Sequence, residues 1–193
     1  MNSSPEARDG NKKVAALLMI VGVVLLLVNV LLAQQNKKLR FLASRPDRSL
    51  EVRAGTVLPS LEGVDDDGNR QSINYGQDAR KTVLLIFSPN CRACGDNLPN
   101  WEAIINGIDR RSFRLFAISL QSQGFKEYES RHRINGIVIL TEIDAKYRVA
   151  YNLVLTPQII LIGSDGKVER VWTGVLQQED KRDVERALNV QLP

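Results

Sequence analysis

Two cysteines, the only ones in the chain, stand three positions apart in the segment Cys91-Arg92-Ala93-Cys94. The apolar, β-branched run 82–87 before them has the length of a buried strand. The residues after them predict a helix, because large apolar side chains recur on one helical face (Trp101, Ile104, Ile105 and Ile108). Cysteines at positions i and i+3 of a helix start lie close enough to form a disulfide without moving the backbone. The pattern therefore predicts a pair of thiols that is oxidised and reduced during turnover.

The two thiols are expected to differ. Cys91 stands at the predicted helix N-terminus, where free N–H groups and the helix dipole favour negative charge. We therefore expect its pKa to be lowered and its thiolate to attack disulfides. Arg92 adds a positive charge beside it. Cys94, one turn into the helix, is expected to be more buried and to resolve the mixed disulfide that Cys91 forms.

Other uses of such a cysteine pair stay open at this point. A zinc site takes about four ligands, and the chain adds only His132, in a charged stretch that we interpret as a solvated helix face. A purely structural disulfide over so short a loop would restrict the unfolded chain little. Soft Cu(I) prefers thiolates, so a non-enzymatic copper chaperone using Cys91, Cys94 and His132 is one alternative.

A proline stands directly before another predicted strand, in the sequence Thr156-Pro157 followed by the apolar run 158–162. Proline is tolerated at the first position of a strand because it need not donate a ladder hydrogen bond there. If the bond is cis, the backbone of Thr156 is presented near the sulfurs and can pair with a substrate strand. With the cysteines upstream, we predict the cis form.

The rest of the chain predicts alternating strands and helices. Further strands are expected at 113–120, 137–140 and 168–172, and further helices at 124–133, 144–151 and 178–188. Segments rich in Asp, Gly and Asn predict turns at 65–69 and 163–166, the second within a hairpin. This order indicates an α/β fold, with a central mixed sheet flanked by helices.

A run of 20 residues from Val14 to Ala33, apolar except for Asn29, predicts a helix long enough to cross a bilayer. A cleavable signal peptide would have a shorter apolar core and small residues before the cleavage site, whereas Leu31 is bulky. We therefore predict an N-terminal tail (1–13), a single transmembrane helix (14–33), a juxtamembrane linker (34–51) and a folded domain (52–193).

The net charge of +4 is distributed unevenly. Residues 1–48 contain eight Lys or Arg and three Asp or Glu, whereas residues 49–193 contain 18 and 19. The basic residues flank the predicted span, where lipid headgroups attract them, so the basicity does not indicate nucleic-acid binding. Three basic residues precede the span and five follow it, which by the positive-inside rule favours a cytoplasmic domain.

These motifs resemble the thioredoxin superfamily, and most closely the membrane-anchored TlpA/ResA-type thiol-disulfide oxidoreductases of its redoxin (AhpC/TSA) branch. The resemblance covers about residues 52–190. It rests on the segments 55–59, 67–68, 87–94, 156–157 and 165–167, on Pro99 and on Gly174. It implies a thioredoxin-like fold with an N-terminal redoxin hairpin and an inserted segment at 121–153. It also implies a Cys91 nucleophile, a resolving Cys94, and substrate contacts at Thr156 and cis-Pro157, without a cofactor.

The chain departs from the family pattern at three positions. Asn90 replaces the common Trp before the first cysteine, Ala93 replaces the common Pro before the second, and Leu85 stands where cytoplasmic thioredoxins carry a buried acid. We expect Asn90, Arg92 and Ala93 to tune the redox potential. These departures leave the direction of exchange open, and the resemblance favours a reductant that serves cytochrome maturation or enzyme assembly.

The similar proteins hold their catalytic domain outside the cytoplasm, in conflict with the charge count. We follow the resemblance and expect a single-pass protein of the bacterial inner membrane with a periplasmic domain. Its partners would be protein thiols and disulfides, together with a protein electron donor or acceptor that the sequence does not identify. A thiol peroxidase of the redoxin branch is the other alternative: Ser88 fits that branch's Pro-x-x-x-Thr/Ser-x-x-Cys pattern, but Leu84 replaces its proline.

Overall fold

The computed structural model of the chain describes residues 18–36, 50–132, 134 and 136–193. It divides into two units, one containing the N-terminal helix and one formed from Pro46 onward. The N-terminal helix, Leu18–Asn36, is long and apolar enough to cross a membrane, and its side chains are exposed. It includes most of the predicted span. Residues 14–17, the tail 1–13 and most of the predicted linker lie outside the described residues, so those boundaries stay predictions.

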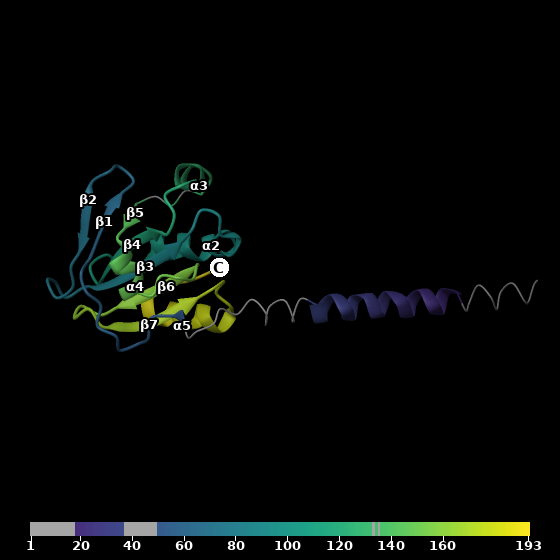
Figure 1. Cartoon of the computed structure of the whole chain (residues 1–193). Coiled ribbons are helices and arrows are strands. Elements are labelled where there is room, and N and C mark those ends of the chain that lie inside the picture. The colour runs from purple at the N-terminus through teal and green to yellow at the C-terminus, as the bar shows by residue number, and fades with distance from the viewer. Residues whose placement is uncertain (1–17, 37–49, 133, 135) are drawn as a thin grey trace, which may run out of the picture. The chain divides into compact units, whose positions relative to one another are not determined.

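The second unit is built on one seven-stranded sheet with the strand order β2-β1-β5-β4-β3-β6-β7 (Figure 1). The strands are β1 Leu61–Asp65, β2 Arg70–Ile73, β3 Lys81–Phe87, β4 Phe113–Ser119, β5 Val138–Ile143, β6 Gln158–Ile162 and β7 Val168–Thr173. β3, β4 and β5 pair in parallel, and the other neighbours pair antiparallel. The predicted mixed sheet is therefore confirmed.

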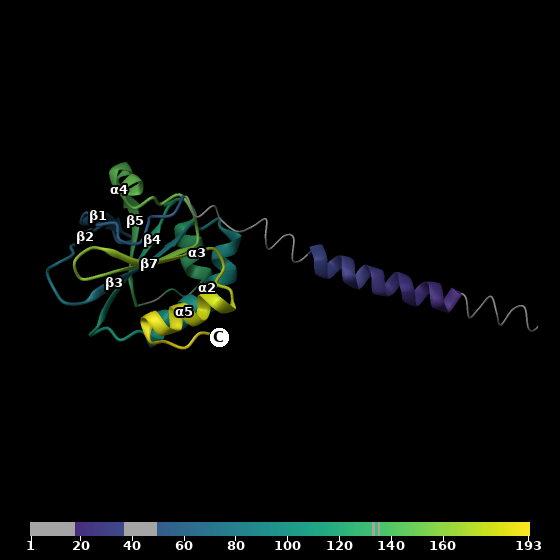
Figure 2. The same cartoon turned by 90° about the horizontal axis from the view of Figure 1, so that it is seen from below.

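Helices cover both faces of this sheet, and Figure 2 shows α4 and α5 on opposite sides of it. The helices of this unit are α2 Arg92–Gly107, α3 Phe125–Arg131, α4 Ala145–Ala150 and α5 Gln178–Leu188. Alternate residues of β3 enter two cores: Phe87 packs with α2, α3 and α5, whereas Ile86 packs with α4. A central strand buried on both faces needs apolar side chains at successive positions. The unbroken apolar run 83–87 reflects this double burial.

The N-terminal redoxin hairpin that the resemblance implied is formed by β1 and β2. Asp65 ends β1, and its carboxylate accepts hydrogen bonds from the Gln71 side chain (2.8 Å) and from the backbone N–H groups of Asn69 (2.7 Å) and Asp67 (3.1 Å). The Gln71 bond, together with those backbone bonds, holds the pKa of Asp65 below its ordinary value of 3.8. One carboxylate therefore fixes the turn between the two strands.

The inserted segment differs in detail from the sequence prediction. β5 is longer than the expected strand at 137–140, and α3 is shorter than the expected helix at 124–133. His132 was predicted on a solvated helix face, and this was wrong: it is half-buried after the end of α3, with its ring centroid 4.5 Å from that of Tyr128. The imidazole is partly withdrawn from water because α3 turns its aromatic side toward the sheet.

Candidate active site

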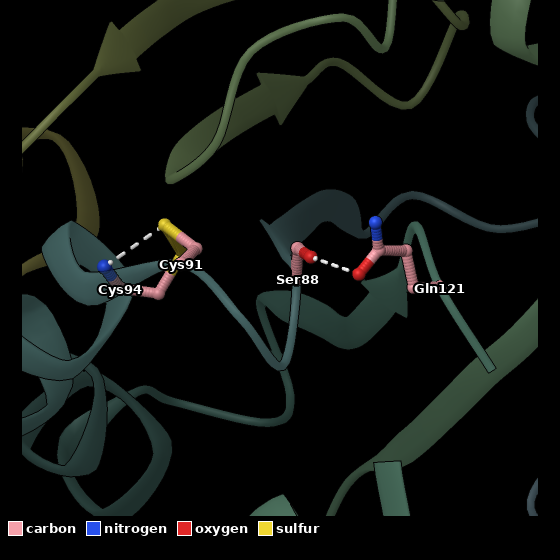
Figure 3. Close-up of a disulfide and its surroundings, with 4 residues drawn as sticks. All are labelled: Ser88, Cys91, Cys94 and Gln121. Atoms are coloured by element: carbon pink, nitrogen blue, oxygen red, sulfur yellow. Dashed lines mark hydrogen bonds between the residues drawn. A yellow bond between two sulfur atoms is a disulfide. The ribbon is translucent and has the colours of Figure 1, made fainter. Parts of the chain in front are cut away.

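Cys91 and Cys94 form a disulfide at the start of α2, with their Cα atoms 5.3 Å apart (Figure 3). Cys91 is the N-cap residue of the helix, and its Sγ accepts a hydrogen bond from the backbone N–H of Cys94 at 3.1 Å. The first turn of a helix has N–H groups without partners inside the helix. The N–H of Cys94 is shared between the Cys91 carbonyl oxygen, at 3.1 Å, and the Cys91 sulfur, where it can stabilise negative charge once the disulfide opens.

The two cysteines differ in exposure. Cys91 is half-buried, whereas Cys94 is fully buried in the apolar core beneath α2. Leu85, also buried in this core, fills the place of the acid that cytoplasmic thioredoxins carry. The predicted deeper burial of Cys94 is therefore confirmed, and a partner can reach the Cys91 sulfur first.

The Thr156–Pro157 peptide bond is cis. Gln158, the next residue, is paired with Ile86 near the end of β3, so the cis bond lies at the sheet edge from which the Cys91 loop departs. The carbonyl oxygen of Pro157 accepts a hydrogen bond from the backbone N–H of Gly174 at 2.8 Å. The structure thus brings the predicted substrate-binding pair, Thr156 and Pro157, to the same edge of the sheet as the cysteines.

The loop before Cys91 is held by a contact that the sequence analysis missed. Ser88 Oγ donates a hydrogen bond to Gln121 Oε1 at 3.0 Å (Figure 3), and Asn90 Nδ2 donates to the same oxygen at 3.4 Å. Ser88 directly follows β3 and Gln121 lies just after β4, and these strands run side by side in parallel. Polar residues that follow neighbouring parallel strands meet at one sheet edge, a signal that could have identified Gln121.

The predicted tuning residues lie next to Cys91 in the sequence, and none of them is fully buried. Arg92 and Asn90 are exposed, and Ala93 is half-buried. Asn90, which replaces the family's common Trp, joins the hydrogen bonds to Gln121. The position before Cys91 therefore carries a polar side chain that contacts Gln121, rather than an aromatic ring.

An aromatic cluster supports the site from below. Phe87, the last residue of β3, contacts Trp101 edge-on with ring centroids 6.1 Å apart, stacks on Tyr128 at 5.2 Å, and lies 6.2 Å from Phe125. Trp101 is fully buried, as expected from its helical face. Burial raises the pKa of Tyr128 to about 12, so its phenol stays neutral. The cluster packs β3, α2 and α3 together in the core next to the Cys91 loop.

The structure also places the residues on which the thiol peroxidase and copper chaperone alternatives depend. Leu84 is buried within β3, and the Ser88 hydroxyl donates to Gln121. Among the described residues, no three His, Cys, Asp or Glu side chains are grouped so that they could hold a metal ion. His132 is therefore not assembled with Cys91 and Cys94 into the copper site considered from the sequence.

An open groove of about 890 Å³ lies beside the cysteine loop. Its walls come from the hairpin, from β5 and from the residues after β4, and it reaches Asn90 and Gln121. Charged residues of both signs line it, among them Glu62, Arg70 and Glu142. The groove offers an extended polar surface next to the residue that precedes Cys91.

No protein-family model and no curated protein matches the chain. Among solved structures, the thioredoxin domain of a thiol-disulfide oxidoreductase from Bacteroides vulgatus is 23% identical, with a TM-score of 0.57 over 72% of this chain and 100% of that one. StoA from Bacillus subtilis is 16% identical, with a TM-score of 0.54 over 66% and 97%. A peroxiredoxin-like protein from Aquifex aeolicus is 14% identical, with a TM-score of 0.57 over 72% and 88%. These similarities establish the thioredoxin-like fold that the resemblance implied.

Proposed function

We propose that this chain, which has the thioredoxin-like fold, is a membrane-anchored thiol-disulfide oxidoreductase that exchanges its Cys91–Cys94 dithiol or disulfide with extracytoplasmic proteins. The observation that carries the proposal is the Cys91–Cys94 disulfide at the N-terminus of α2, with one sulfur half-buried and the other fully buried. Thr156 and cis-Pro157, at the same sheet edge, support it as a surface for the backbone of a client.

In the reducing direction, the Cys91 thiolate attacks one sulfur of a client disulfide. A mixed disulfide forms, and the other client sulfur leaves as a thiolate that takes up a proton. The N–H of Cys94, which already points at Cys91 Sγ, stabilises the attacking thiolate. The groove beside Asn90 has room for a neighbouring part of the client chain.

Cys94 then loses its proton and attacks Cys91 Sγ, which forms the intramolecular disulfide and releases the second client thiol. Two electrons have passed to the client, and a protein dithiol must reduce the pair again. We propose this direction, with a role of the cytochrome-maturation or enzyme-assembly type. The reverse sequence of the same steps would oxidise client thiols. The reduction potential of the Cys91–Cys94 pair distinguishes the two directions: about −270 mV is typical of a reductant and about −120 mV of an oxidant.

The test of exchange uses two single variants. Cys91→Ser should abolish the reduction of a model disulfide protein, whereas Cys94→Ser should accumulate mixed disulfides that appear on non-reducing gels and disappear with dithiothreitol. If neither variant differed from the wild type in turnover or trapping, the proposal would be wrong. Consumption of hydrogen peroxide without disulfide exchange would instead favour the thiol peroxidase.

The N-terminal helix supports the proposed anchor because it is exposed and apolar over a length that can cross a bilayer. We propose that it holds the catalytic domain in the periplasm of a bacterial cell, where membrane-anchored proteins can pass electrons to secreted clients. A reporter enzyme that is active only outside the cytoplasm, fused to the C-terminus, should be active. An inactive fusion beside an active cytoplasmic reporter would contradict the periplasmic orientation.

A further inference from the structure

Asn29 is the one polar side chain between Leu18 and Ala33 in the N-terminal helix. It is exposed, and its Nδ2 donates a hydrogen bond to the carbonyl oxygen of Leu25 at 2.9 Å. A carboxamide has two N–H groups and an oxygen that accepts two hydrogen bonds, so this bond leaves most of its capacity unused. In the hydrocarbon of a bilayer, where water cannot supply partners, such capacity favours a partner from another helix.

Asn29 lies on a stripe of residues spaced alternately four and three positions apart. We call the Asn29 stripe the set Leu18, Gly22, Leu25, Asn29 and Leu32. This is the spacing of the contact positions in paired helices. The leucines of the stripe are 51–66% exposed, and the space beyond the Gly22 Cα, where a Cβ would be, is open. A glycine on such a face lets two helix backbones approach closely.

We propose that the Asn29 stripe pairs two copies of this chain in the membrane as a parallel dimer, with the two Asn29 side chains hydrogen-bonded to each other. This inference rests on the anchor of the proposed function. Copies inserted in the same direction place Asn29 at the same depth. A carboxamide is both donor and acceptor, so it complements its own copy across a two-fold axis. A helix from a different protein could replace the second copy only if it carried a polar group at the same depth in the membrane.

The expected strength follows from hydrogen bonds between membrane helices. Such bonds contribute modestly, so replacing Asn29 by Leu should weaken dimerisation about 3-fold to 30-fold. One asparagine at a contact position also sets the register of paired helices. The opposite face of the helix lacks the glycine that lets two backbones approach closely, so an amide moved there should not restore a dimer of wild-type strength. Leu27, two positions earlier and also exposed, lies on that face.

The experiment uses the full chain in phosphatidylcholine vesicles under reducing conditions, in two pools labelled at the C-terminus with donor and acceptor fluorophores. Energy transfer should rise with protein density in the bilayer and fall when unlabelled wild type is added. Asn29→Leu and Gly22→Leu should shift the curve to higher density. The double variant Leu27→Asn, Asn29→Leu keeps the composition of the helix and should behave like Asn29→Leu.

Energy-transfer curves that are equal for the wild type and Asn29→Leu would overturn the proposal. A wild type that stays monomeric at every density would also overturn it, and this result is expected if Asn29 binds a different membrane protein. A double variant that dimerises as the wild type does would overturn the assignment of the face. Flotation of the vesicles separates failure of the dimer from failure of the anchor. A chain that does not float with the lipid would contradict both the anchor and the dimer, whereas a monomer that floats would contradict only the dimer.

Discussion

The difference in burial between Cys91 and Cys94 predicts a large difference in chemical reactivity once the disulfide is reduced. The informative proteins are the two single variants, Cys94→Ser, which keeps Cys91, and Cys91→Ser, which keeps Cys94. In the folded protein we expect the remaining thiol of Cys94→Ser to react with iodoacetamide about a hundredfold faster. The reason is that Cys91 is half-buried, whereas Cys94 has no exposed surface.

The magnitude follows from what must open to expose Cys94. The Cys91 carbonyl oxygen accepts hydrogen bonds from the N–H groups of Cys94 (3.1 Å) and Gly95 (3.4 Å), and both break when the first turn of α2 unravels. Two such bonds contribute about 2 kcal/mol, and the buried apolar side chain adds about 1 kcal/mol. About 3 kcal/mol corresponds to roughly a hundredfold smaller population of reactive molecules.

The assay follows alkylation by mass spectrometry at neutral pH in the presence of a phosphine reductant. Repeating it in concentrated urea gives the intrinsic reactivity of each thiol, and there the two variants should react within about threefold of each other. Folded variants whose rates also lie within threefold would refute the argument, because the burial of Cys94 would then not limit access to its sulfur.

Three further predictions concern stability and the loop. Phe87→Ala should lower the free energy of unfolding by about 3–5 kcal/mol in urea titrations, because it empties the centre of the aromatic cluster; exposed Val149→Ala should change it by less than about 0.5 kcal/mol. Gln121→Ala should slow disulfide reduction about fivefold, since it removes the hydrogen-bond acceptor for Ser88. Gln121→Glu keeps an acceptor oxygen and should retain the rate. Equal rates for the wild type and both variants would contradict the role of this contact. Because the pKa of Asp65 is lowered in the folded state, its ionised form stabilises the protein above about pH 3.8, and this contribution is lost as the pH falls through the folded pKa. The stability difference between the wild type and Asp65→Asn, measured by thermal unfolding, should therefore shrink toward low pH. A difference that grows toward low pH would contradict this prediction.

The elements nearest the cysteines could be predicted from the sequence because their patterns are local. The continuous apolar run of β3 and the apolar face of α2 each reflect burial of a whole element. The hairpin strands β1 and β2 were implied only by the resemblance. They are short, and few of their side chains are buried, among them Leu61 and Ile73. An element at the margin of a sheet leaves a weak periodic signal.

The contact between Ser88 and Gln121 could not be read from spacing, since 33 positions separate the two residues. Their approach depends on the order of strands in the sheet, which places β4 directly beside β3. The prediction of a solvated environment for His132 was wrong for a related reason. The charges on both sides of it in the sequence suggested water, but α3 presents Tyr128 to the sheet and the imidazole packs on that ring. Local charge does not report which side of a short helix is covered.

The hydrogen bond from the Cys94 N–H to Cys91 Sγ affects how any Cys91 variant must be interpreted. The sulfur of the proposed nucleophile also caps α2, so deleting it would remove the proposed nucleophile and the helix cap in one step. Serine retains an acceptor oxygen and is a good N-cap, whereas alanine has none and would cost the helix about 1 kcal/mol. A Cys91→Ala protein would therefore combine lost chemistry with a frayed helix start, and only the serine variant isolates the chemistry.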